Sequence, residues 1–199
     1  MLILASASPR RQELLRHAGI RFTVHPSDIE ETLRVGESPV DCAQRLATEK
    51  ALAVSGRYPQ DFVLGADTIV VVEDAIFGKP SDADDASRML RSLSGRTHKV
   101  ITGICLASPV AGNAKQLRAE NRELTTTSET TLVTMCTLTD NEIRNYIASG
   151  EPMDKAGAYA IQGLASRWIP RIEGDYTNVV GLPVALVYRM LQESGALPK

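Results

Sequence analysis

The chain has 199 residues, of which 43% are hydrophobic, so it can bury a core of its own. Its 22 basic residues nearly cancel its 24 acidic ones, which argues against nucleic acid or an anionic membrane surface as a partner. No apolar run approaches the roughly 20 residues that span a bilayer, and three cysteines without CxxC spacing are typical of reduced thiols, so we expect a cytoplasmic protein.

An apolar strand over residues 1–5 runs directly into an expected helix over residues 10–18. The junction between them, SASPRR at residues 6–11, supplies a serine suited to the N-cap and a proline suited to the first helical position. Arg10 and Arg11 then fall in the first turn, where cations oppose the positive end of the helix dipole. This placement indicates that an anion binds there; the alternative is a pair of solvated surface arginines.

The next expected elements carry further charged residues. Residues 22–24 predict a short strand, and an acidic loop that contains Glu31 follows it. Ser38-Pro39 repeats the signal of a cap followed by proline and predicts a long helix that carries Lys50. The side chains expected on the buried side of this helix are those of Ala43, Leu46, Ala47, Leu52 and Val54.

Residues 62–72 form the clearest buried strand of the sequence, and residues 75–77 are expected to pair with it as a hairpin. The remaining expected elements are a helix over 82–93, a strand over 100–107, a flexible polar loop over 108–123, a strand over 125–138, a helix with a capping box over 139–148, short strands at 159–161 and 168–169, and a helix over 183–193. This interleaving of strands and helices predicts a mixed α/β fold.

Asp67 lies in the middle of the apolar strand over residues 62–72. A carboxylate in such surroundings needs a cation, a set of hydrogen bonds or a metal ion. Lys50 and Lys79 are the obvious cationic partners. The alternative is a structural aspartate that accepts hydrogen bonds from nearby backbone N–H groups.

Two kinds of polar residue recur along the chain, and polyphosphate chemistry needs both. Hydroxyl and cationic side chains can hold phosphate oxygens, whereas carboxylates can hold Mg²⁺ or Mn²⁺ and accept a proton from an attacking water. The candidates are Ser6, Arg11, Lys50 and Lys79 for the phosphates, and Glu31 and Asp67 for the carboxylates. The sequence has no Walker motif and no GxGxxG motif, so it does not support a P-loop NTPase or a dinucleotide enzyme.

The ordered motifs resemble those of the Maf family, nucleoside triphosphate pyrophosphatases once described as septum-formation inhibitors. The resemblance extends from residue 4 to about residue 191 and rests on SASPRR at 6–11, EET at 30–32, EKA at 49–51, LGADT at 64–68, GKP at 78–80, SGRTH at 94–98, TG at 102–103, DKAGAYAIQG at 154–163 and GDYTNVVGLP at 174–183. The chain departs from the usual family pattern at Met135-Cys136 and in the length of the 108–123 loop.

The resemblance implies cleavage of a nucleoside triphosphate between its α and β phosphates, with a divalent cation, Mg²⁺ or Mn²⁺. It implies that Asp67 accepts the proton of the attacking water and that Glu31 helps to bind the metal. Ser6, Arg11, Lys50 and Lys79 would then surround the triphosphate, and further cleft candidates are Thr97 and Lys155. It also implies one domain over residues 1–199, an elongated, curved sheet with a central cleft like that of inosine triphosphate pyrophosphatases, and a homodimer.

Three positions favour the family branch that acts on dTTP and UTP. These are Arg10, Thr68 and Gln162, which match that branch residue by residue. A pyrimidine offers a small edge of donors and acceptors that Arg and Gln side chains can satisfy. One alternative is a pyrophosphatase for 7-methyl-GTP or a modified purine, since the sister branch resembles the chain elsewhere. Another is a non-catalytic protein that inhibits septum formation by binding a partner.

Overall fold

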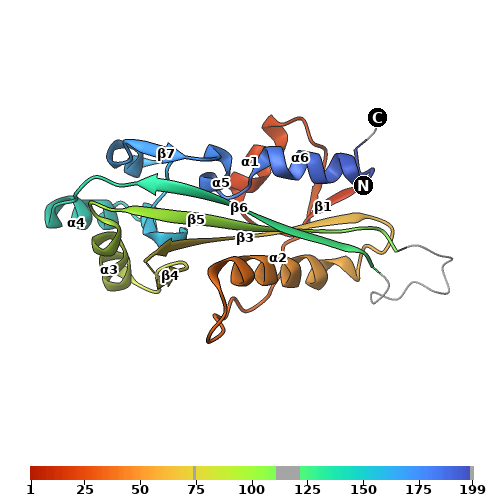
Figure 1. Ribbon diagram of the computed structural model, residues 1–199, viewed down its shortest axis with the longest axis horizontal. Helices are drawn as coiled ribbons and strands as arrows, with labels where there is room; N and C mark the ends of the chain where they lie inside the picture. Colours follow the sequence, from red (N-terminus) through yellow and green to blue (C-terminus); the bar gives the residue numbers. More distant parts are fainter. Residues whose placement is uncertain (74, 111–121, 198–199) are drawn as a thin grey trace. The chain divides into compact units, whose positions relative to one another are not determined.

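The computed structural model describes residues 1–73, 75–110 and 122–197 (Figure 1). The chain divides into two compact units: Met1–Asp67, Thr102–Glu129 and Gly181–Lys199 form unit 1, and Thr68–Ile101 and Thr130–Val180 form unit 2. Within the described ranges, none of the helices combines the length and apolar character that crossing a membrane requires. The single domain over residues 1–199, the elongated shape and the central cleft stay predictions.

Among these residues the strands form one seven-stranded sheet in the order β2-β1-β3-β5-β6-β7, with β4 paired to β3. The strands are β1 (Leu2–Leu4), β2 (Thr23–Val24), β3 (Phe62–Val72), β4 (Ala75–Phe77), β5 (Thr97–Ala107), β6 (Leu124–Thr134) and β7 (Arg171–Glu173). The α-helices are α1 (Pro9–His17), α2 (Pro39–Ser55), α3 (Ala83–Leu93), α4 (Asp140–Ala148), α5 (Tyr176–Val180) and α6 (Val184–Glu193). The mixed α/β class is therefore confirmed.

Unit 1 has helices on both faces of its part of the sheet, with α1 and α6 on one face and α2 on the other (Figure 1). The alternation of β1 explains this arrangement, because successive side chains of a strand point to opposite faces. Leu2 and Leu4 join the hydrophobic cluster that contains α1 and α6 residues, whereas Ile3 and Ala5 join the cluster that contains α2 residues. β1 pairs in parallel with both β2 and β3.

Helix α2 lies against two glycines of the sheet. A Cβ atom on Gly65 of β3 would stand 2.1 Å from the carbonyl oxygen of Ala47, and one on Gly103 of β5 would stand 2.2 Å from that of Ala43. Real Cβ contacts are never this short, so any larger residue would push the helix away. Two glycines therefore set the distance between α2 and the sheet.

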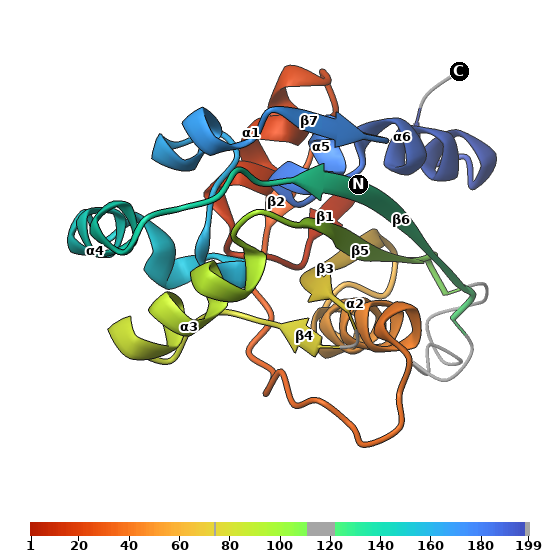
Figure 2. The same ribbon diagram turned by 60° about the vertical axis from the view of Figure 1, so that its left-hand side comes forward.

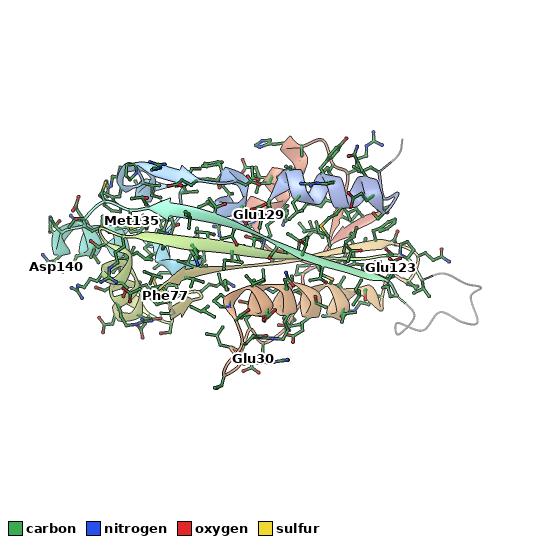
Figure 3. The ribbon with its side chains drawn as sticks, viewed as in Figure 1. Glu30, Phe77, Glu123, Glu129, Met135 and Asp140 are labelled. Atoms are coloured by element: carbon green, nitrogen blue, oxygen red, sulfur yellow. The ribbon has the colours of Figure 1, made fainter. Side chains whose placement is uncertain are left out.

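Unit 2 packs its core from the β3–β4 hairpin, α3, α4 and the 3-10 helices that follow. Figure 2 shows β4 beside β3, with α3 in yellow-green and α4 in teal. Phe77 at the end of β4 and Met135 after β6, both labelled in Figure 3, are buried in this core. Met135, which departs from the family pattern, is thus a packing residue of unit 2.

Most helix starts follow the sequence prediction. Ser38 accepts a hydrogen bond from the backbone N–H of Asp41 at the start of α2, and Thr139 forms a capping box with Glu142 at the start of α4. The hairpin of β3 and β4 and the final helix are also confirmed. The predicted loop over residues 108–123 lies mostly outside the described residues.

Several predictions of local structure are wrong. Leu52 is 41% exposed, because a residue two positions before Val54 lies far round the helix from it. Residues 159–161 do not form a strand, and Trp168 ends the 3-10 helix Leu164–Trp168, in which its ring packs edge-on against Tyr146. The strand predicted over residues 125–138 ends at Thr134.

We expect Gly65→Ala to lower the free energy of unfolding by about 3 kcal/mol or more, because its Cβ meets helix backbone rather than a movable side chain. Urea unfolding measures the change. Gly56→Ala is the control, since no atom lies within 4 Å of its added Cβ. Equal stability of the two variants would contradict the role of Gly65 as a spacer.

His98 makes stability depend on pH. It is 2% exposed, its Nε2 lies 2.8 Å from the Tyr159 hydroxyl, and burial lowers its pKa from 6.5 to about 4. Between these two values the unfolded state binds more protons, so the free energy of unfolding falls as the pH falls from about 6.5 to about 4.

Because one pKa unit corresponds to about 1.4 kcal/mol, the stability of the wild type relative to His98→Gln should fall by roughly 2–3 kcal/mol between pH 7 and pH 4. Urea unfolding at a series of pH values measures this difference, and the other titrating groups cancel in it. A difference that does not change with pH would mean that His98 is protonated alike in both states.

Candidate functional site

The candidate site of unit 1 is centred on Lys50, whose ammonium group contacts two carboxylates. Its Nζ lies 2.5 Å from Oδ1 of Asp67 and 2.7 Å from Oε1 of Glu31. The side chains of Lys50 and Asp67 are 9% and 7% exposed, whereas that of Glu31 is 38% exposed. A buried ion pair thus meets a second, more accessible carboxylate.

The fold explains how Lys50 reaches Asp67. Asp67 stands two positions after Gly65 on β3, so both face the same side of the sheet, the side that α2 covers. Lys50 lies between Ala47 and Ala51, whose backbone atoms come closest to Gly65. The close approach of α2 to β3 therefore carries the lysine to the aspartate, and Lys50 is confirmed as a cationic partner of Asp67.

Ser6 and Arg11 form a second group of the same unit. The Nη1 of Arg11 donates to the Ser6 hydroxyl at 3.1 Å, and its Nε donates to the carbonyl oxygen of Gly181 at 2.8 Å. Arg11 is only 9% exposed, so the alternative of a solvated surface arginine is wrong for it, and its neighbour Arg10 is half-buried.

The charges of the site act on Arg11. Burial lowers the pKa of its guanidinium, and the negative charges of Asp67 and Glu31 act in the opposite direction. Arg11 therefore lies within electrostatic reach of both carboxylates. Sequence reasoning missed Gly181 as its backbone acceptor, although the glycine belongs to a motif that had been singled out.

Glu31 lies on an irregular loop that Arg45 of α2 fixes in place. The Arg45 guanidinium binds both carboxylate oxygens of Glu37, at 2.6 and 2.7 Å, and donates to the backbone carbonyl of Thr32 at 3.0 Å. Glu49 binds the same guanidinium and also Arg34 of the loop. The Arg45 hydrogen bond lowers the pKa of Glu37. Sequence reasoning missed this network, for which the only signal was alternating charge on one helix.

The other candidates belong to unit 2. Thr68 follows Asp67 on β3 and is half-buried, and the hydroxyl of Thr97 lies 2.9 Å from that of Thr134. Lys155 donates to the backbone carbonyl of Glu151 at 3.3 Å and forms an ion pair with Asp154.

Lys79 and Gln162, also of unit 2, are both exposed. The backbone N–H of Gly157 donates to the carbonyl of Gly78 at 3.0 Å, which joins the segment of Lys79 to that of Lys155. This hydrogen bond thus connects the predicted motif at residues 78–80 with the one at residues 154–163.

The arrangement in unit 1 suits a hard cation as well as a lysine. Mg²⁺ is usually held by one or two carboxylates, with phosphate oxygens and waters in the other positions. Glu31 and Asp67 present two oxygens toward one point, which Lys50 now contacts. Among the residues that the structure describes, no three His, Cys, Asp or Glu side chains are grouped so as to hold a metal ion.

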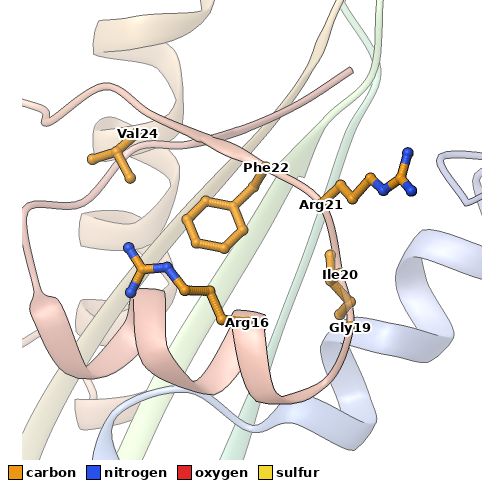
Figure 4. A pocket seen from close by; sticks show the side chains of 6 residues that line it. All are labelled: Arg16, Gly19, Ile20, Arg21, Phe22 and Val24. Atoms are coloured by element: carbon orange, nitrogen blue, oxygen red, sulfur yellow. The ribbon is translucent and has the colours of Figure 1, made fainter.

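A separate hollow of about 430 Å³ lies beside the end of α1 (Figure 4). The residues that line it are Arg16, Gly19, Ile20, Arg21, Phe22 and Val24. Arg16 already lies over the Phe22 ring at 5.8 Å and donates to Gln12. None of the predicted site residues lines this hollow, so it is not the candidate site.

Comparisons with known proteins match the chain over nearly its whole length. A dTTP/UTP pyrophosphatase of Koribacter versatilis is 56% identical over 98% of this chain and 95% of its own, and one of a Geobacillus species is 48% identical over 98% of each. Among solved structures, a HAM1 protein from Coxiella burnetii is 16% identical, with a TM-score of 0.48 over 96% of this chain and 98% of its own. The family described as "Maf-like protein" matches residues 1–194. The chain therefore belongs to the Maf family.

Proposed function

We propose that this protein is a nucleoside triphosphate pyrophosphatase that hydrolyses dTTP and UTP to the monophosphate and pyrophosphate. The observation that carries the proposal is the buried Asp67 carboxylate, held by Lys50 beside Glu31, in a chain 56% identical to a relative of that activity. The 7-methyl-GTP reading has no such relative among the proteins compared above. The free thiols of Cys42, Cys105 and Cys136 further support a reducing compartment, the cytoplasm.

Asp67 is the proposed proton acceptor. As an attacking water forms a bond to the α-phosphorus, its proton passes to the Asp67 carboxylate, the bond from the α-phosphorus to the bridging oxygen breaks, and pyrophosphate leaves with that oxygen. A carboxylate that is 7% exposed and lies on a regular strand has little freedom to change its orientation during this step.

A divalent cation, Mg²⁺ or Mn²⁺, would be held by Glu31 and Asp67, and it would supply positive charge to the phosphate oxygens. The residues fit such an ion because their oxygens converge on one cationic group already. Lys50 can then turn its ammonium group from the carboxylates toward phosphate oxygens, since its long side chain has several rotatable bonds.

The proposed phosphate ligands of unit 1, besides Lys50, are Ser6 and Arg11. Their mutual hydrogen bond fixes the guanidinium before substrate arrives, which reduces the entropy lost on binding. In unit 2 the proposed ligands are Lys79, Thr97 and Lys155. The base is proposed to be read by Arg10, Thr68 and Gln162.

Asp67→Asn should lower kcat for pyrophosphate release from dTTP at least about 10²-fold, because the amide cannot accept the proton. Steady-state assays with Mg²⁺ and with Mn²⁺, over a panel of dTTP, UTP, CTP, GTP and 7-methyl-GTP, measure it. The matched control is Asp61→Asn, which changes an aspartate of the same unit that pairs with the amino terminus. Wild-type activity in Asp67→Asn, or preference for 7-methyl-GTP, would contradict the proposal.

Glu31→Gln should weaken the apparent affinity for the metal about tenfold or more, since an amide oxygen replaces a charged ligand. Metal titrations of the activity at saturating dTTP measure the shift, and Mn²⁺ binding followed by electron paramagnetic resonance measures it without turnover. Glu30→Gln is the control, because the Glu30 side chain, labelled in Figure 3, is the exposed neighbour on the same loop. Equal shifts in both variants would mean that Glu31 acts only through general charge.

A further inference from the structure

Gln162 sits on a tight turn of unit 2. The backbone N–H of Gly163 donates to the carbonyl of Ala160 at 3.1 Å and closes the turn, and the Gln162 side chain is exposed at its tip. Turns of this size are ordinarily mobile at the surface. In this turn, hydrogen bonds to two side chains without a proposed role fix the backbone on both sides of Gln162.

Tyr146 of α4 holds the start of the turn. Its hydroxyl accepts a hydrogen bond from the backbone N–H of Ala160 at 3.2 Å and donates one to Oε1 of Glu151 at 2.8 Å. Its side chain is fully buried, and its ring packs edge-on against Trp168 with the centroids 5.3 Å apart. The hydroxyl is thus presented by a side chain with little freedom to move.

Glu151 holds the end of the turn. Its Oε2 accepts a hydrogen bond from the backbone N–H of Leu164 at 3.1 Å. A Cβ atom on Gly163 would stand 2.3 Å from Oε1 of the same carboxylate, so the glycine gives the carboxylate room to reach the turn. Hydrogen bonds therefore fix the backbone two residues before and two residues after Gln162.

We propose that Tyr146 and Glu151 are positioning residues that fix the backbone from which the Gln162 side chain projects and thereby set the choice between uracil and cytosine nucleotides. This inference rests on the proposed function of Gln162 in reading the base. UTP and CTP differ in the order of donors and acceptors at ring position 3 and its exocyclic neighbour. A fixed backbone limits the positions that the Gln162 amide can reach, so it favours the placement that pairs with one of the two bases over placements that pair with the other.

The competing explanation is that the two side chains only satisfy buried backbone groups. Both explanations predict some loss of stability when a bond is removed. Only positioning predicts a change in the ratio of kcat/KM for UTP to that for CTP, and only positioning predicts that this change disappears once Gln162 is gone.

The experiment is a double-mutant cycle on that ratio with the full-length protein. We expect Gln162→Ala to lower the ratio about tenfold, since it removes the amide that reads the base. Tyr146→Phe should lower it about threefold to tenfold, since it removes the hydroxyl that binds Ala160 and Glu151. The double variant should have the ratio of Gln162→Ala alone. Thermal unfolding of each variant shows that the comparison is made between folded proteins.

Gly163→Ala provides a second test that removes no polar group. Its Cβ displaces the end of a flexible glutamate side chain, so the protein should fold while the Glu151 carboxylate leaves the turn. The same fall in the ratio is expected. Glu142→Gln is the control, because its carboxylate bonds Thr139 and Trp168 instead of the backbone of the turn, and its ratio should equal that of the wild type.

The outcomes distinguish base reading by Gln162 from positioning by Tyr146 and Glu151. If Gln162→Ala leaves the ratio unchanged, Gln162 does not read the base, and both that part of the proposed function and the positioning role are overturned. If Gln162→Ala lowers the ratio but Tyr146→Phe and Gly163→Ala do not, only the positioning role is overturned. If Tyr146→Phe lowers the ratio by the same factor in the wild type and in Gln162→Ala, the positioning role is overturned as well.

Discussion

The buried contact between Lys50 and Asp67 is the constraint on which the site of unit 1 depends. Removing two charges from water costs several kcal/mol for each, and their attraction offsets that loss only when the geometry is close. The 2.5 Å contact meets this condition, and it requires α2 to lie almost against the backbone of β3. Gly65 is the residue that allows it. A more stable apolar pair could fill the same space, so the charges point to chemistry rather than to stability.

The same contact orders the rest of unit 1. Once α2 is fixed, its charged face determines where the preceding loop can run, because Arg45 and Glu49 bind Thr32, Arg34 and Glu37. Glu31 is thereby brought to Lys50 although its own segment has no regular structure. A rigid helix thus positions a carboxylate that lies on a loop, and the loop needs no packed core of its own.

The sequence predicted those features that depend on local chemistry. The caps at Ser38 and Thr139 follow from neighbouring residues, so they could be predicted directly. The position of Asp67 in an apolar strand also indicated that it needs a partner, and Lys50 was among those named. By contrast, residues 159–161 have strand propensity, but the hydrogen bond that Ala160 donates to the buried Tyr146 hydroxyl, whose ring packs on Trp168, overrides it. Contacts of this kind join residues distant along the chain, and composition does not reveal them.

Glycines next to the proposed functional side chains have two distinct physical roles in this protein. At Gly65 the obstructing atoms belong to helix backbone, so the glycine sets the distance between two elements and its replacement acts on the whole of unit 1. At Gly163 the obstructing atoms are the end of one carboxylate, so the glycine admits a single side chain and its replacement acts locally. Both glycines lie within two residues of a proposed functional residue, Asp67 or Gln162. Asp67 is placed by packing, whereas Gln162 is placed by hydrogen bonds. Replacing the neighbouring glycine by alanine should therefore lower stability at Gly65 and change the choice of substrate at Gly163.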